Sequence, residues 1–135
     1  MKRLDERVFV GGQIRPEDLP DIACAGVRTI VNNRPDGEEA GQPTAAELAR
    51  TAQALGLAYH DIPIAGGIPE AAIEDMADAL ETSPGPVLAF CKSGTRSTYL
   101  WALARARGGD DPAALAATAA EAGYDLRPIA PLLTR

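Results

Sequence analysis

Short apolar runs recur along the chain, and longer stretches of helical pattern separate them. Four of these runs predict β-strands, at residues 7–10, 27–31, 57–62 and 87–90. They are too short for helices, and most contain the β-branched and aromatic residues that favour strands. The last run, Val87-Leu-Ala-Phe90, is apolar at every position, which is typical of a parallel strand that is covered on both faces.

Capping signals mark where helices begin and end between these strands. Thr44-Ala-Ala-Glu47 is a capping box, and Asp111-Pro112 supplies an N-cap followed by proline at the first helical position. Glycines follow several helical segments and are typical helix ends. The patterns predict helices at 16–25, 44–55, 70–81 and 112–122, a helix through Tyr99–Leu103 that ends before Gly108, and a short helix within 126–135.

Alternating strands and helices indicate an α/β fold with a mostly parallel central sheet flanked by helices. The length of 135 residues, without repeats or long linkers, predicts one domain over residues 1–135. In open sheets of this class, ligands bind beyond the carboxyl ends of the strands. We therefore expect three loops to lie together at one edge of the sheet, at residues 32–39, 63–67 and 91–96.

The composition narrows the classes of function. A formal net charge of −6 argues against a general nucleic-acid binder or a protein of membrane surfaces. No apolar run approaches the roughly 20 residues of a membrane-spanning helix, and the charged N-terminal residues are unlike a signal peptide. We expect a soluble, cytoplasmic protein, and no motif indicates a metal or a cofactor.

The two cysteines differ in their surroundings. Cys24 lies between alanines next to Ile22, and a free cysteine in such a place is typically a small buried hydrophobic residue. Cys91 instead opens a polar loop that leads into a helix. The backbone N–H groups of such a loop bind anions, and with the helix dipole and Arg96 they favour the thiolate. Cys91 is therefore the candidate nucleophile, and its loop supplies the candidate substrate-binding residues Lys92, Ser93, Gly94 and Thr95.

The segment Cys91-Lys-Ser-Gly-Thr-Arg96-Ser97 resembles the active-site loop of cysteine-dependent phosphatases, and also that of rhodanese-type sulfurtransferases. A wider resemblance covers nearly the whole chain. It is to a bacterial family described as phosphatase-like domains of beta-lactamase-hydrolase-like proteins, whose members are also designated candidate sulfurtransferases. It rests on Gly12-Gln-Ile, Val31-Asn-Asn-Arg-Pro-Asp-Gly-Glu-Glu39, Gly41-Gln-Pro, Ala54-Leu-Gly-Leu-Ala-Tyr59, Ile62-Pro63, Leu100-Trp101 and Ala122-Gly-Tyr124. The resemblance implies a dual-specificity-phosphatase-like fold, with Cys91 as nucleophile and Arg96 as oxyanion clamp.

Three features bear on whether the transferred group is phosphate or sulfur. Four residues separate Cys91 from Arg96, whereas tyrosine-phosphatase loops have five, and the shorter loop resembles rhodanese loops that hold a persulfide. The loop at 63–67, where phosphatases of this fold carry a catalytic Asp, contains no carboxylate. Phe90 stands where phosphatases usually place His. Sulfur transfer between thiols needs less acid catalysis, because a thiol of low pKa is a good leaving group.

Further residues on the same edge have smaller predicted roles. Asp36 is the substitute acid, or else it only stabilises its turn. The hydroxyl of Ser97 either donates to the Cys91 sulfur or caps the helix. We expect His60 to be a packed or surface residue and Trp101 to lie in the core.

Two basic residues complete the candidate site. Lys92 either adds positive charge near the thiolate or faces solvent. Arg34 either binds the far end of an anionic acceptor or pairs with Glu38 or Glu39.

Three functional hypotheses follow. In the first, a sulfurtransferase, the Cys91 thiolate takes sulfane sulfur from thiosulfate or a persulfide and passes it to an acceptor. The second is a low-efficiency protein-tyrosine or dual-specificity-like phosphatase that forms a phosphocysteine. The third is a non-catalytic module that senses anions or redox state through reversible oxidation of Cys91. We expect a small anionic or sulfur-bearing substrate, with a persulfide-handling enzyme as a candidate partner.

Overall fold

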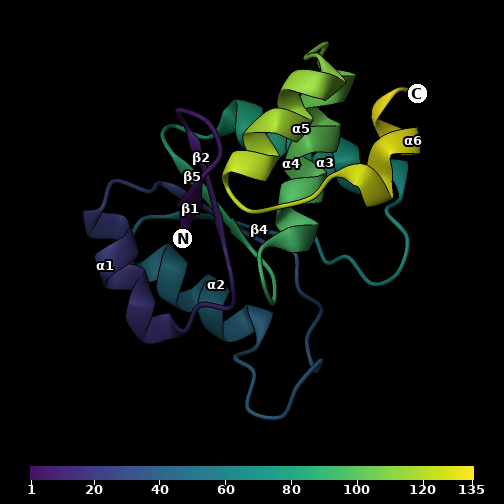
Figure 1. The fold of residues 1–135 in the computed structure, drawn as a ribbon. Coiled ribbons are helices and arrows are strands. Elements are labelled where there is room, and N and C mark those ends of the chain that lie inside the picture. The colour runs from purple at the N-terminus through teal and green to yellow at the C-terminus, as the bar shows by residue number, and fades with distance from the viewer.

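A five-stranded sheet forms the centre of the molecule (Figure 1). The computed structural model describes all of residues 1–135. Its strands are β1 (Lys2–Arg3), β2 (Val8–Gly11), β3 (Thr29–Asn32), β4 (Ala58–Asp61) and β5 (Val87–Phe90), in the spatial order β1-β2-β5-β3-β4. All neighbours pair in parallel except β1, which runs antiparallel to β2. This is the mostly parallel α/β sheet that the sequence predicts.

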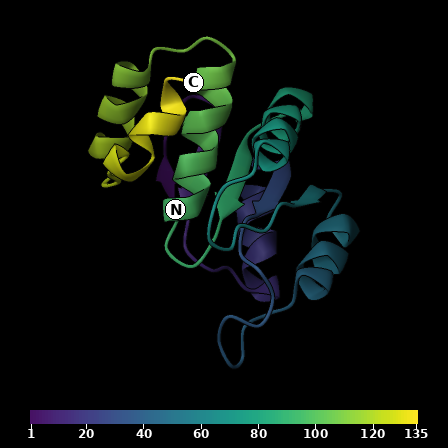
Figure 2. The same cartoon turned by 90° about the vertical axis from the view of Figure 1, so that its right-hand side faces the viewer.

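Helices cover both faces of this sheet. Helices α1 and α2 lie on one face, and α3, α4, α5 and α6 lie on the other (Figures 1 and 2). Every predicted helix is present, and the predicted ends agree closely with the observed ones. The bounds are α1 (Leu19–Cys24), α2 (Ala45–Ala54), α3 (Glu70–Thr82), α4 (Thr95–Arg107), α5 (Pro112–Glu121) and α6 (Ala130–Leu133), with 3₁₀ turns at Pro16–Asp18 and Arg127–Ile129.

The alternation of side chains along the strands divides the core into two clusters. Val87 and Ala89 of β5 face the helices α3 to α6, whereas Leu88 and Phe90 face α1 and α2. The parallel register places Ile30 of β3 beside Leu88, in the same smaller cluster. Successive side chains of a strand point to opposite faces, so a strand that is apolar throughout fills both clusters. Burial on both faces fixes the position of the last residue of β5, from which the candidate loop departs.

The sequence pattern does not predict the N-terminal strand β1. Lys2 and Arg3 pair with Val10 and Phe9 of β2, although both of their own side chains are exposed. A two-residue edge strand with no buried side chain has no apolar pattern that could predict it.

The prediction that Cys24 is buried is wrong, because its side chain is exposed. Leu19 of α1 is fully buried, and Ile22 and Ala23 pack partly buried against the same cluster. These three positions have the spacing of a single helix face. Cys24 lies one residue further around the helix and therefore points away from the core.

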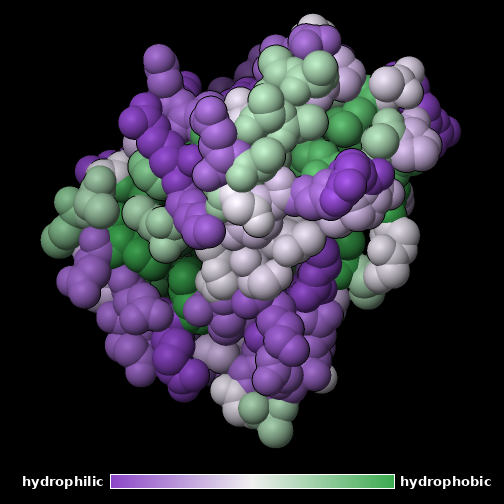
Figure 3. Space-filling view, in the orientation of Figure 1, coloured by the Kyte–Doolittle hydropathy of each residue, from purple (hydrophilic) through white to green (hydrophobic).

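The segment between β3 and α2 extends from the body of the molecule at the lower end of Figure 1. Its surface is mainly hydrophilic in the same orientation (Figure 3). It carries the charged side chains of the candidate site: Arg34, Asp36, Glu38 and Glu39.

No helix of the protein is long and apolar enough to span a membrane.

Truncating Leu88 tests the two-sided burial of β5. Leu88 is 1% exposed in the middle of the sheet, and Leu55 at the end of α2 is 40% exposed. We expect Leu88→Ala to lower the free energy of unfolding by about 2–5 kcal/mol, because it removes buried methyl groups and leaves a cavity. Leu55→Ala is the matched control and should change it by less than about 0.5 kcal/mol. Urea denaturation measures both values, and equal losses would contradict the assignment of Leu88 to the core.

Candidate active site

The candidate nucleophile lies where β5 ends and the chain turns into α4. Cys91 follows the last strand residue directly, and α4 begins at Thr95. Between them, Gly94 has a φ of +94°, in the left-handed region that glycine adopts without strain. A Cβ added to Gly94 would overlap the hydroxyl of Tyr124. The turn therefore requires glycine both for its backbone conformation and for its lack of a side chain.

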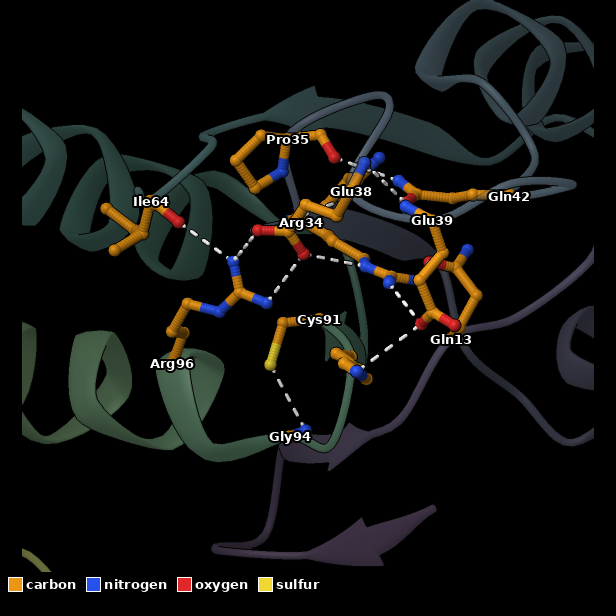
Figure 4. A network of polar contacts seen from close by, with 12 residues as sticks. Gln13, Arg34, Pro35, Glu38, Glu39, Gln42, Ile64, Cys91, Gly94 and Arg96 are labelled. Atoms are coloured by element: carbon orange, nitrogen blue, oxygen red, sulfur yellow. Dashed lines mark hydrogen bonds and ion pairs between the residues drawn. The ribbon is translucent and has the colours of Figure 1, made fainter. Parts of the chain in front are cut away.

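The loop encloses the sulfur of Cys91. The residue is 1% exposed, and its Sγ accepts a hydrogen bond from the backbone N–H of Gly94 at 3.1 Å (Figure 4). Burial alone would raise the pKa of the thiol, because it disfavours the charged form. Backbone N–H groups directed at the sulfur outweigh this effect and hold the pKa of Cys91 below its usual range. These groups belong to Ser97, Ser93, Gly94 and Arg96.

Ser97 acts through its backbone, while its hydroxyl has a structural contact. The hydroxyl donates to Oδ1 of Asn33 at 2.8 Å, in a buried position. The side-chain amide of Asn33 donates in turn to the carbonyl of Ile62 at 2.9 Å. Neither role predicted for the Ser97 hydroxyl is observed. Instead, it ties the first turn of α4 to the residues that follow β3 and β4.

Arg96 joins the three loops that the sequence predicts to meet at one edge. Its guanidinium donates to both carboxylate oxygens of Glu38, at 2.8 and 2.9 Å, and to the carbonyl of Ile64 at 2.9 Å (Figure 4). The pKa of Arg96 is raised, first by the hydrogen bonds to Glu38 and further by the charge of Cys91. The expected gathering of these loops is thus present, and Arg96 lies next to the sulfur.

Arg34 is almost fully buried, with 3% of its side chain exposed. It donates to Glu38 at 2.8 Å, to Glu39 at 2.6 Å and to the side-chain carbonyl of Gln13 at 3.0 Å. Of the two predicted roles for Arg34, the pairing with Glu38 and Glu39 is the one present. A buried guanidinium needs such partners, because burial without them would disfavour its charge.

Glu38 is held as a carboxylate by two cations. Hydrogen bonds from Arg96 and Arg34 lower its pKa to about 2. A group that is ionised across the physiological range cannot supply a proton to a leaving group. Glu38 is therefore an acceptor for the two arginines and no general acid.

The remaining loop residues face outward. Lys92 is exposed, and its ammonium lies 3.5 Å from Glu39, so the solvent-facing alternative holds for its side chain. The hydroxyls of Ser93 and Thr95 lie 3.0 Å apart and form an exposed hydrogen bond. These side chains surround the mouth of the loop, while the backbone N–H groups point inward to the sulfur.

Neither Asp36 nor the 63–67 loop brings a carboxylate into contact with the 91–96 loop. The carboxylate of Asp36 accepts a hydrogen bond from the backbone N–H of Ala45 at 2.8 Å, at the start of α2. This contact is structural, in line with the stabilising alternative for Asp36, although it reaches the start of α2 instead of the turn of Asp36 itself. Ile64 provides the only polar contact from the 63–67 loop to Arg96, and it is a carbonyl. Asp61 lines a separate cleft, beside α3.

Four residues of the site carried no individual prediction: Asn33 and Ile64, described above, and Gln13 and Tyr124. Gln13 follows β2 and orients Arg34, and Tyr124 donates its hydroxyl to the carbonyl of Ser93 at 3.1 Å. Gln13 could have been found, because β2 is parallel to β5 and its carboxyl end lies at the same edge of the sheet. Tyr124 lies far along the chain, and only packing brings it beside the loop.

Comparison with known proteins agrees with this geometry. A family model described as "Beta-lactamase hydrolase-like protein, phosphatase-like domain" matches residues 1–108. A beta-lactamase hydrolase-like protein of Agrobacterium fabrum is 40% identical over 108 residues, which cover 79% of this chain and 25% of that protein. The chain therefore spans about a quarter of the length of that curated relative.

Solved structures place the fold among the cysteine-dependent phosphatases. The crystal structure of a candidate phosphatase from Neisseria meningitidis matches with a TM-score of 0.84 and 31% identity, over 98% of this chain and 94% of that one. Kinase associated phosphatase, whose catalytic-site cysteine is replaced by serine in the crystal, matches with a TM-score of 0.71 and 19% identity, over 86% and 75%. At 19% identity, the similarity to kinase associated phosphatase concerns the fold alone.

Alkylation measures how far the loop favours the thiolate. In a Cys24→Ser variant, Cys91 is the only thiol left. We expect its alkylation rate by iodoacetamide to titrate with a midpoint below about 8.5, the pKa of a free cysteine, because the loop N–H groups stabilise the anion. Mass spectrometry at a series of pH values gives the midpoint. The same variant in urea lacks the amide contacts, and an equal midpoint in the folded and unfolded protein would contradict the proposed stabilisation.

Proposed function

The chain belongs to the family of phosphatase-like domains of beta-lactamase hydrolase-like proteins, and on that premise we propose that it is a cysteine-dependent phosphatase. The observation that carries the proposal is the Cys91 sulfur inside a ring of backbone N–H groups, with the guanidinium of Arg96 beside it. Such a ring stabilises both a thiolate nucleophile and the oxygens of a transferred phosphoryl group. The family description and the phosphatase-like fold support the same reaction class.

The proposed reaction has two steps, and Cys91 carries the phosphoryl group between them. The Cys91 thiolate attacks the phosphorus of a phosphate monoester, an S–P bond forms, and the bond from phosphorus to the ester oxygen breaks. The loop N–H groups and Arg96 bind the phosphoryl oxygens during the transfer. Water then attacks the phosphorus, the S–P bond breaks, and phosphate and the Cys91 thiolate are restored.

The lack of a general acid limits the substrates. An alkyl ester oxygen needs a proton as it leaves, whereas a phenolate or carboxylate leaves with its own electron pair and no proton. Asp36 is engaged with α2, Glu38 is held ionised, and the hydrogen bond from Arg34 lowers the pKa of Glu39. The proposed substrates are therefore phosphate esters of acidic hydroxyl groups and acyl phosphates.

Sulfur transfer is the second candidate, and the dimensions of the loop favour it. Only four residues separate Cys91 from Arg96, and the N–H of Gly94 already donates to the sulfur itself. A loop this short resembles those that hold one additional sulfur atom. The Cys91 thiolate would attack the sulfane sulfur of thiosulfate, the S–S bond would break, and sulfite would leave without a proton. A thiolate or cyanide would then take the outer sulfur and restore Cys91.

Mass spectrometry of the intact protein distinguishes the two reactions. The wild-type protein is incubated with an aryl phosphate and, separately, with thiosulfate, and the adduct on Cys91 is identified. We expect a phosphoryl adduct and steady release of phosphate, both absent in Cys91→Ser. Arg96→Ala should slow the reaction by about 10²–10³-fold, because it removes one charged donor to the transferred group. Asp36→Asn is the matched control and should retain activity, since the side-chain oxygen of Asn can also accept a hydrogen bond from the N–H of Ala45.

Three other outcomes would contradict the phosphatase proposal or the absence of a general acid. A persulfide on Cys91 and thiocyanate on addition of cyanide, without phosphate release from the ester, would replace the phosphatase by the sulfurtransferase. A protein that forms neither adduct, although Cys91 still reacts with iodoacetamide, would point to the sensing module. Loss of activity in Asp36→Asn would restore that residue as a general acid.

A further inference from the structure

The guanidinium of Arg96 already holds an anion that belongs to the chain itself. Glu38 accepts from both terminal nitrogens of Arg96 at 2.8 and 2.9 Å, in the parallel two-bond geometry with which arginine binds phosphate and other oxyanions (Figure 4). The carboxylate thus occupies two of the five N–H donors of Arg96 that a substrate oxyanion could use, and it neutralises the charge of the guanidinium. Glu38 is 30% exposed and Arg96 is 24% exposed, so solvent and small ions reach the pair.

The cations of the three loops are paired with carboxylates before any substrate arrives. Arg34, Lys92 and Arg96 are the cations, and they pair with Glu38 and Glu39. The thiolate of Cys91 adds a further negative charge beside Arg96. An incoming dianion therefore meets cations that already have carboxylate partners, in contrast to an anion site with a free arginine.

We propose that Glu38 is the residue that determines which oxyanions the site accepts, because its carboxylate competes with them for Arg96. The proposal rests on the assignment of Arg96 to substrate binding. Oxyanions that bind Arg96 more strongly than a carboxylate enter, and weaker ones are excluded. Phosphate esters and thiosulfate are both subject to this competition, since both present terminal oxygens.

The contacts of Glu38 allow its side chain to leave Arg96 without opening the loop. Its backbone N–H donates to the side-chain carbonyl of Gln42 at 3.1 Å, and that of Glu39 donates to the same atom at 3.3 Å. These bonds hold the backbone of the segment. Arg34 holds one carboxylate oxygen from the other side at 2.8 Å, so a rotated Glu38 keeps a cationic partner. Release of Arg96 therefore requires a change of side-chain rotamer alone.

Protonation does not remove this competitor under physiological conditions. The two arginines keep the pKa of Glu38 at about 2, so the carboxylate stays charged wherever the protein functions. Only a stronger ligand for Arg96, or a substitution, frees the guanidinium.

Isothermal titration calorimetry of anion binding tests the competition without any turnover. All proteins carry Cys91→Ser, and the probes are inorganic phosphate and, separately, thiosulfate. The Glu38→Gln substitution keeps the shape of the side chain and removes its charge, so this variant should bind phosphate about ten-fold more tightly than the protein with Glu38. Glu39→Gln changes the net charge equally but leaves the Glu38–Arg96 pair intact. It should change the affinity by less than about three-fold.

The comparison of the two variants decides the outcome. Equal gains in Glu38→Gln and Glu39→Gln would overturn the proposal, because the effect would then be one of net charge. Weaker binding in Glu38→Gln would also overturn it, since Glu38 would then orient Arg96 for the substrate. If Glu38→Gln fails to fold, Glu38→Asp replaces it. The shorter carboxylate reaches both arginines less well, so binding should tighten by about two- to three-fold, and an unchanged affinity would overturn the proposal. A chain without phosphatase turnover can still show the Glu38 effect, so the two proposals fail separately.

Discussion

The site depends on one physical requirement, which is that a buried thiolate must be surrounded by donors. A charged sulfur that is 1% exposed would otherwise revert to the neutral thiol. The chain meets the requirement with backbone N–H groups, which need no side chains and take little space. To direct them inward, the loop must turn sharply, and Gly94 permits that turn. Tyr124 then donates to the carbonyl of Ser93, and Gly12 leaves room for the carbonyl of Lys92, where a larger residue would not fit.

The parallel sheet determines which charges join the sulfur. The ends of β2, β3, β4 and β5 lie at one edge, and each supplies one contact to the site: Gln13, Arg34, Ile64 and Cys91. Arg34 follows β3 closely and is buried there, so carboxylates must accompany it. Glu38 and Glu39 come from the same segment four and five residues later. The burial of Arg34 thus explains why Glu38 lies within reach of Arg96.

Much of this arrangement can be predicted from the sequence, and the exceptions have a common cause. The apolar run at 87–90 and the capping signals locate the strands and helices, because these patterns are local. The meeting of the loops follows from the parallel order. The direction of a side chain does not follow, since it depends on what packs beside it: the hydroxyl of Ser97 turns to Asn33, and the carboxylate of Asp36 turns to α2. The edge strand β1 is missed because it buries none of its side chains.

The same charges bear on the choice between phosphate and sulfur. Phosphate esters and thiosulfate must both displace Glu38 from Arg96, but a phosphate ester must then lose its ester group without an acid, whereas thiosulfate passes its sulfane sulfur to Cys91 and releases sulfite without a proton. The fold and the family description favour phosphate, and the four-residue spacing between Cys91 and Arg96 is the feature that resembles sulfur-transfer loops. In the site proposed above, only a strong oxyanion displaces Glu38 from Arg96, and such a site is compatible with either reaction. For such a site, the leaving group and the displacement of Glu38 decide the chemistry, because the thiolate and its ring of N–H groups serve either reaction equally.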